Sequence, residues 1–144
     1  MENITPSTHA VKQVVDNKEL MRLATTAMKN SYSPYSKFTV GAALLAASGR
    51  IYLGCNVENA SFTATVCAER VAMATAVAAG ERNFEAIAVA IGSPLDSMPA
   101  PCGICRQFMS EFGLNLRVIM EFKGSLHELA LKELLPHAFV TFSS

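Results

Sequence analysis

The chain has 144 residues, 51% of them hydrophobic, which fits one domain with a hydrophobic core of its own. Its formal net charge at pH 7 is zero, without a basic stripe, which argues against a nucleic-acid backbone as partner and favours a small substrate. The mean hydropathy of +0.28 is high for a small monomer, so we expect other subunits to cover part of the apolar surface.

Helices and strands alternate along the chain. A polar N-terminal arm is expected over residues 1–15, followed by a single domain over residues 16–144. Hydrophobic periodicity predicts, in chain order, a helix, a two-stranded hairpin, a helix, a strand, a helix and a strand, over residues 16–29, 38–46 with 51–58, 66–79, 84–91, 103–112 and 116–121. The pattern of residues 125–135 is compatible with a short helix or with an edge strand. This order indicates an α/β fold in which helices cover both faces of a mixed sheet.

No segment of the sequence has the apolar length of a signal peptide or of a membrane span. We therefore expect a cytoplasmic protein without a membrane partner. In that reducing compartment, metal binding or catalysis explains cysteines better than disulfides do. The four cysteines are Cys55, Cys67, Cys102 and Cys105.

Three of these cysteines have the spacing of a zinc site. Cys102 and Cys105 form a Cys-x-x-Cys motif at one predicted helix start, and Cys67 lies at another. Helix N-termini stabilise thiolates, so two of them meeting at one point would offer three ligands and leave the fourth zinc position open, as in catalytic sites. Two other interpretations remain: a closed structural site with Cys55 as fourth ligand, and a thioredoxin-like redox pair.

The two residues that follow Ala68 carry opposite charges. On a helix, Glu69 would point about 200° around from Cys67, an awkward angle for a ligand but a suitable one for reaching a zinc-bound water. The alternative is that Glu69 only favours the helix dipole as a first-turn acid. Zinc with three thiolates carries excess negative charge, and we expect the Arg70 guanidinium to offset it through hydrogen bonds to the sulfurs.

The segments CAE from Cys67 and PCGIC from Pro101 are similar to the motif of zinc-dependent deaminases, His- or Cys-x-Glu followed by Pro-Cys-x-x-Cys. Three further segments extend this likeness: YSKFTVGAA from Tyr35, GCNVENAS from Gly54 and ELLPHAF from Glu133. Over residues 32–139 the chain thus resembles the small homotetrameric cytidine deaminases of nucleoside salvage. The resemblance implies a three-layer α-β-α fold with a five-stranded mixed sheet, and so a fifth strand at residues 126–130.

The resemblance also implies roles for individual residues around the metal. One zinc ion per chain would be bound by Cys67, Cys102 and Cys105. Glu69 would shuttle protons, and Arg70 and Gln107 would support the metal site from behind the ligands.

Other residues would bind the substrate or a neighbouring subunit. The expected nucleoside contacts are Phe38, Asn56, Glu58, the backbone N–H of Ala68, and Phe139, which would stack on the base in a neighbouring subunit. Contacts between subunits are expected at Ala60 and Phe62. The family commonly has tyrosine where this chain has Phe62, so one hydroxyl is missing from that contact.

The implied activity is hydrolytic deamination of cytidine and deoxycytidine to uridine and deoxyuridine with release of ammonia. A zinc-activated water and Glu69 would carry it out. Three alternatives remain: a deaminase of a cytosine-containing nucleoside antibiotic, a deaminase of cytosine in a polynucleotide, and a zinc-stapled interaction domain without activity. The neutral charge and the lack of tryptophan argue against the polynucleotide.

Overall fold

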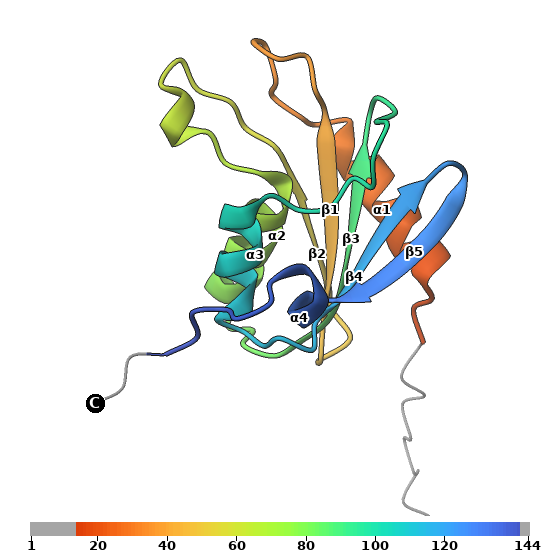
Figure 1. Cartoon of the computed structure of the whole chain (residues 1–144), viewed down its shortest axis with the longest axis vertical. Coiled ribbons are helices and arrows are strands. Elements are labelled where there is room, and N and C mark those ends of the chain that lie inside the picture. Colours follow the sequence, from red (N-terminus) through yellow and green to blue (C-terminus); the bar gives the residue numbers. More distant parts are fainter. Residues whose placement is uncertain (1–13, 142–144) are drawn as a thin grey trace, which may run out of the picture.

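A computed structural model describes residues 14–141, and its centre is one five-stranded sheet in the order β2-β1-β3-β4-β5 (Figure 1). The expected arm at residues 1–15 lies outside this range except for its last two residues. The strands are β1 (Val40–Ala46), β2 (Ile51–Cys55), β3 (Phe84–Ile91), β4 (Arg117–Phe122) and β5 (Ser125–Ala130). β3 and β4 are parallel and the other neighbours are antiparallel, so the sheet is mixed, as expected. Residues 125–130 form an edge strand and not a helix.

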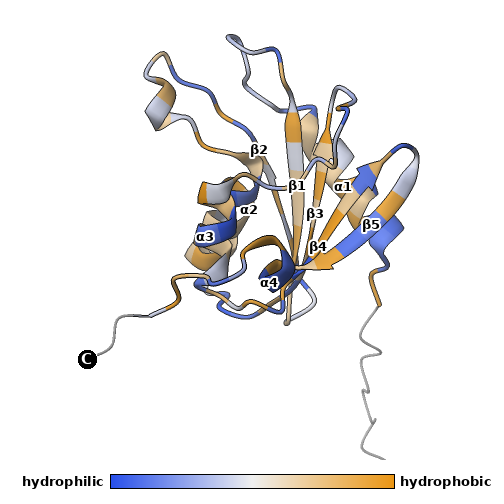
Figure 2. Cartoon of the chain, viewed as in Figure 1, coloured by the Kyte–Doolittle hydropathy of each residue, from blue (hydrophilic) through white to orange (hydrophobic). Residues whose placement is uncertain are grey.

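Helices cover both faces of this sheet, which confirms the three-layer arrangement (Figure 1). One face packs against α1 (Asn17–Met28). The other face packs against α2 (Ala68–Ala78), α3 (Gly103–Ser110) and the short α4 (Leu131–Leu134). Side chains of β1 alternate between the two cores: Leu44 faces α2 and Leu45 faces α1. Both faces are apolar, as the orange strands in the middle of the sheet show (Figure 2).

The helix boundaries follow their sequence signals. α1 begins after Asp16, whose carboxylate accepts a hydrogen bond of 2.8 Å from the backbone N–H of Glu19. α2 is followed by Gly80, which has a φ of +97°. The N-terminal ends of α2 and α3 bear on the predicted zinc site, because Cys67 directly precedes α2 and Cys102 directly precedes α3. Within residues 14–141, no helix combines the length and the apolar character that crossing a bilayer requires.

The first turns of α2 rest directly on the backbone of β2 at Gly54. A Cβ atom at this position would overlap the carbonyl oxygen of Ala68 and the backbone nitrogen of Ala72, both in α2. The helix and the strand are therefore closer than any side chain at position 54 would allow. This contact sets the position of the N-terminus of α2, and with it the position of Cys67.

We predict that Gly54→Ala lowers the free energy of unfolding by about 1–3 kcal/mol, because the added methyl group forces α2 away from β2. Denaturant unfolding measures this change. Gly103→Ala adds the same group where no atom lies within 4 Å and is the matched control. Equal stability of the two variants would show that the close contact at Gly54 does not matter.

Candidate active site

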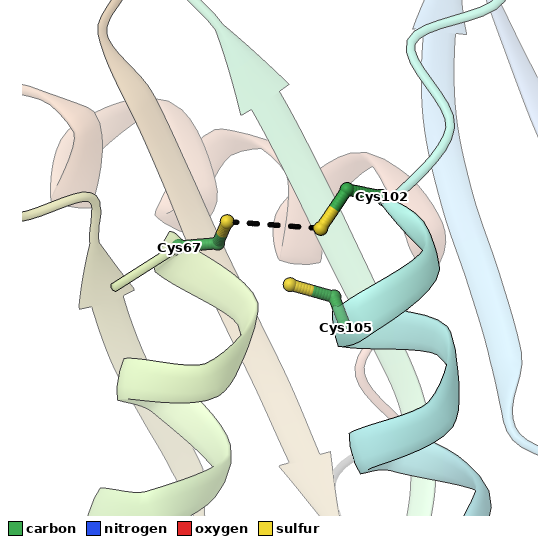
Figure 3. Close-up of side chains that lie close together, drawn as sticks. All are labelled: Cys67, Cys102 and Cys105. Atoms are coloured by element: carbon green, nitrogen blue, oxygen red, sulfur yellow. Dashed lines mark hydrogen bonds between the residues drawn. The ribbon is translucent and has the colours of Figure 1, made fainter. Parts of the chain in front are cut away.

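Three cysteine sulfurs meet where the N-termini of α2 and α3 converge (Figure 3). Their Sγ atoms all lie within 4.8 Å of one another, and the Sγ atoms of Cys67 and Cys102 are 3.8 Å apart. A tetrahedral zinc with Zn–S bonds of about 2.3 Å separates its sulfur ligands by about 3.8 Å. The sulfurs of Cys67, Cys102 and Cys105 therefore fit a single zinc ion.

The fourth cysteine lies outside this cluster. Cys55 ends β2, and its Sγ is 3.3 Å from the carbonyl oxygen of Asn30. None of the four cysteines is in a disulfide. The described residues thus offer zinc three thiol ligands, and the closed four-cysteine site considered above does not form.

The thiols interact strongly with one another and with Arg70. A hydrogen bond with Cys105 lowers the pKa of Cys67 to about 5; burial opposes this shift, and the Arg70 guanidinium supports it. The same hydrogen bond and burial raise the pKa of Cys105. The proton is thus held by Cys105, because closely spaced thiolates repel one another. A bound cation would remove this conflict.

Arg70 lies behind the sulfurs, as the charge argument predicts. Its Nη2 donates to the Sγ of Cys67 at 3.8 Å and to the carbonyl oxygen of Thr65 at 3.2 Å. Its buried Nε has no hydrogen-bond partner among residues 14–141. The guanidinium therefore has donor capacity left beside the cluster.

Glu69 is a buried carboxyl in the first turn of α2, with 4% of its surface exposed. Removal from water is the main cause that raises its pKa to about 7, and the nearby Cys67 thiolate adds to the shift. A carboxyl with such a pKa can take up and release protons near neutral pH.

One cavity joins Glu69 and two of the thiols to residues far along the chain. It has a volume of about 310 Å³, at the lower end of the range typical of small-molecule sites. Its lining includes Cys67, Cys102 and Glu69 together with Phe38, Asn56 and Glu58. A larger cavity of about 430 Å³ lies between α1 and the β4–β5 turn, but no cysteine lines it.

Asn56 and Glu58 follow the end of β2, which stops at Cys55 and not at the expected residue 58. Val57 between them bridges to Tyr32 and to Val66, so the backbone stays paired there. Asn56 is 8% exposed, and its amide bonds to the backbone of Phe38 and Val40. Both residues face the same cavity, as expected for positions two apart in an extended segment.

The Glu58 carboxylate is held by a backbone turn. Its Oε1 accepts N–H bonds of 3.1 Å from Tyr35 and from Ser36. Desolvation acts to raise the pKa of Glu58, but these donors and the nearby Lys37 outweigh it and hold the pKa below its usual value. Glu58 is therefore a fixed, ionised acceptor at the side of the cavity.

The remaining candidate residues do not line the cavity of their own chain. Gln107 is on α3, and its Nε2 donates to the carbonyl oxygen of Phe139 at 2.6 Å, so it holds the C-terminal segment. Phe139 is 59% exposed. Ala60 is exposed as well, and the 73% exposed ring of Phe62 packs edge-on against Tyr35 at 5.8 Å. Ala68 is buried at the start of α2, where backbone N–H groups have no partner inside the helix.

Several cavity residues carried no signal in the sequence. Ser36 comes from the segment before β1, Thr65 from the segment before α2, and the rest of this set from the connection between β3 and α3. That connection contributes Leu95, Pro99 and Ala100. Loops of this kind show no periodicity from which a lining role can be predicted.

A family model described as the cytidine and deoxycytidylate deaminase zinc-binding region matches residues 14–121. The chain belongs to this deaminase family. A cytidine deaminase of Sporosarcina psychrophila is 43% identical over 127 residues, which cover 87% of this chain and 92% of that protein. A blasticidin-S deaminase of Bacillus cereus is 32% identical over 125 residues, with coverage of 82% and 88%.

Solved deaminase structures share the fold. The cytidine deaminase from Burkholderia pseudomallei matches with a TM-score of 0.81 and 43% identity, covering 87% of this chain and all 100% of the other. The enzyme from Mycobacterium tuberculosis matches with a TM-score of 0.77 and 38% identity, with coverage of 89% and 100%. These matches confirm the α/β fold and the family, and the zinc-binding region of the family model agrees with the thiol cluster.

We predict that Cys105→Ser and Cys67→Ser each lose most of the bound zinc, whereas Cys55→Ser keeps about one zinc per chain. The reason is that only three of the four sulfurs converge on one point. Metal analysis of the purified proteins, with counting of reactive thiols, measures this. Loss of zinc in Cys55→Ser would instead indicate a closed four-cysteine site.

Proposed function

We propose that this deaminase converts cytidine and deoxycytidine to uridine and deoxyuridine, releasing ammonia. One observation carries the proposal: the buried Glu69 carboxyl and two thiols of the three-thiol cluster line the same cavity of about 310 Å³. The relatives named cytidine deaminase support it. We place the reaction in pyrimidine salvage in the cytoplasm.

Zinc held by Cys67, Cys102 and Cys105 would supply a water molecule that is acidic enough to react near neutral pH. Glu69 moves the protons. Its carboxylate takes a proton from the attacking water and passes it to ring N3, which makes C4 electrophilic. Once the oxygen of that water has bonded to C4, Glu69 moves the proton of the new hydroxyl group to the amino group, the C4–N bond breaks and ammonia leaves.

Arg70 keeps the metal acidic in this proposal. Three thiolates would leave zinc with excess negative charge, which weakens its pull on a water molecule. The guanidinium withdraws part of that charge through its contact with the Cys67 sulfur at 3.8 Å. Gln107 would also order the segment that carries Phe139, through its hydrogen bond to the Phe139 carbonyl oxygen.

The other end of the cavity binds the nucleoside. Asn56 and Glu58 contact the ribose hydroxyls, and Phe38 packs beside the sugar and base. The N–H of Ala68, at the start of α2, meets the O2 atom of the pyrimidine. Together these groups place C4 of the base at the thiol cluster.

We further propose that the protein works as a homotetramer. Phe139 is exposed and does not line the cavity of its own chain, which suits a ring that stacks on a base in a neighbouring subunit. Ala60 and Phe62 are on an exposed segment that reaches another subunit. The high mean hydropathy agrees with such an assembly.

A second candidate substrate is a cytosine-containing antibiotic. The observation in its favour is the blasticidin-S deaminase of Bacillus cereus among the relatives. Its identity of 32% is lower than the 43% of the cytidine deaminase of Sporosarcina psychrophila. Blasticidin S therefore belongs in the substrate test.

Ammonia release tests the proposed function. We expect turnover of cytidine and deoxycytidine, and little or none of CMP, blasticidin S or a cytosine-containing oligonucleotide. We predict that Glu69→Gln keeps its zinc but loses about 10²- to 10⁴-fold in rate, because the amide cannot transfer the proton.

Glu121→Gln removes an exposed carboxylate that lies on the α1 side of the sheet and does not line the cavity of the thiols, so it is the control for this variant. Near-normal turnover by Glu69→Gln would exclude the proton role. Turnover of the oligonucleotide alone would overturn the proposed substrate.

Mixed subunits test the role of Phe139. We predict that Phe139→Ala weakens substrate binding by about 1–3 kcal/mol, because the stacked ring is lost. Mixed oligomers of Phe139→Ala chains and Glu69→Gln chains should be more active than the two variants added together. The reason is that a site with an intact Glu69, in a Phe139→Ala chain, can receive Phe139 from a neighbouring Glu69→Gln chain. Phe139→Tyr, which keeps the ring, should stay active. Simple additivity, or a monomer in native mass spectrometry, would contradict the shared site.

A further inference from the structure

Ser31 does not line the cavity itself, but its hydroxyl bonds to the side chain of Asn56, which does. It belongs to the segment between α1 and β1, which runs beside the segment that follows β2. The backbone N–H of Tyr32 donates to the Asn56 carbonyl oxygen at 3.0 Å, and the N–H of Glu58 donates to the Tyr32 carbonyl oxygen at 2.8 Å. Both segments lie beyond the same end of β1 and β2 (Figure 1). Ser31 is thereby fixed next to the side chain of Asn56.

The hydrogen bonds of the Asn56 amide can be counted atom by atom. Its Oδ1 accepts from the Ser31 hydroxyl and from the backbone N–H of Val40 at 2.9 Å. Its Nδ2 donates one N–H to the Phe38 carbonyl oxygen at 2.8 Å. A carbonyl oxygen has two lone pairs and an amide nitrogen two N–H groups. One N–H is therefore the group that Asn56 has left for a ligand.

The direction of the hydrogen bond between Ser31 and Asn56 is fixed by the chemistry of the two groups. Oδ1 of Asn56 carries no hydrogen, so the Ser31 hydroxyl must donate to it. The Ser31 hydroxyl also lies 3.2 Å from that of Ser33, but its single hydrogen is used in the bond to Asn56. A hydrogen bond accepted by an amide oxygen polarises the whole amide, so the bond from Ser31 strengthens the remaining N–H of Asn56 as a donor.

Glu58 offers the cavity a hydrogen-bond acceptor, whereas Asn56 offers a donor. Its Oε1 accepts two backbone N–H bonds, and its Oε2 has only a long contact of 3.4 Å to the N–H of Ser36. The ionised carboxylate can only accept. Asn56 and Glu58 therefore face the cavity as a donor beside an acceptor, which matches a hydroxyl group that accepts one hydrogen bond and donates another.

We propose that Ser31 is a positioning residue for sugar recognition. Its hydroxyl fills the second lone pair of Asn56 Oδ1, so that Asn56 presents an N–H and not a carbonyl oxygen to the sugar. This inference rests on the proposed function, because it takes the ribose hydroxyls as the ligands of Asn56 and Glu58.

The affinities of the zinc-loaded protein for two ligands, uridine and 2′,3′-dideoxyuridine, test this role when they are measured by calorimetry. We predict that Ser31→Ala weakens uridine binding about two- to tenfold, the range for one lost hydrogen bond to a neutral group. Binding of 2′,3′-dideoxyuridine should not change, because that ligand lacks the hydroxyls that Asn56 meets. Ser31→Thr keeps the hydroxyl and should restore uridine binding. In turnover of cytidine, Ser31→Ala should raise KM and leave kcat nearly unchanged.

Ser48→Ala is the matched control, because it removes a serine hydroxyl that bonds to Glu81 far from the cavity. The proposal is overturned if Ser31→Ala changes the binding of both products equally or of neither, or if uridine does not bind to the unaltered protein. Failure of the proposed function is seen separately, as absence of ammonia release from cytidine by the unaltered protein.

Discussion

Three sulfur atoms within 4.8 Å of one another place a strong electrostatic demand on the fold. Without a cation, the three thiols cannot all be ionised at once, because neighbouring thiolates repel one another; the opposite pKa shifts of Cys67 and Cys105 reflect this conflict. Two helix N-termini and the Arg70 guanidinium reduce it from the protein side. Zinc is the partner that resolves it, so the fold around α2 and α3 acquires its full stability only with the metal.

The end of the cavity that Asn56 and Glu58 line depends on a different kind of interaction. No cluster of like charges is present there. The fold must instead hold the polar side chains of Asn56 and Glu58 in one orientation next to a segment without regular structure. The backbone of residues 31–40 supplies donors and acceptors to Asn56 and Glu58, and these two side chains in turn shape that backbone. Each stabilises the other, which gives a loop the precision that binding sites usually take from helices and strands.

Much of the fold follows from local patterns. The cap at Asp16, the buried run of β3 and the Cys-x-x-Cys motif at a helix start each depend on neighbouring residues only, and the structure agrees with all three. The edge strand β5 needed the family likeness, because its short pattern suits two structures. The bonds of Asn56 to Phe38 and of Gln107 to Phe139 join residues 18 and 32 positions apart, so no local pattern predicts them.

The connection between β3 and α3 separates two tasks along the chain. Leu95, Pro99 and Ala100 shape the wall of the cavity, and Cys102 of the thiol cluster follows two residues after Ala100. Cys105 belongs to α3 and Cys102 is the residue directly before it, so the start of the helix, and not residues 92–100, positions these two sulfurs. Changes in its length or composition can therefore alter which substrates enter while the metal chemistry stays intact.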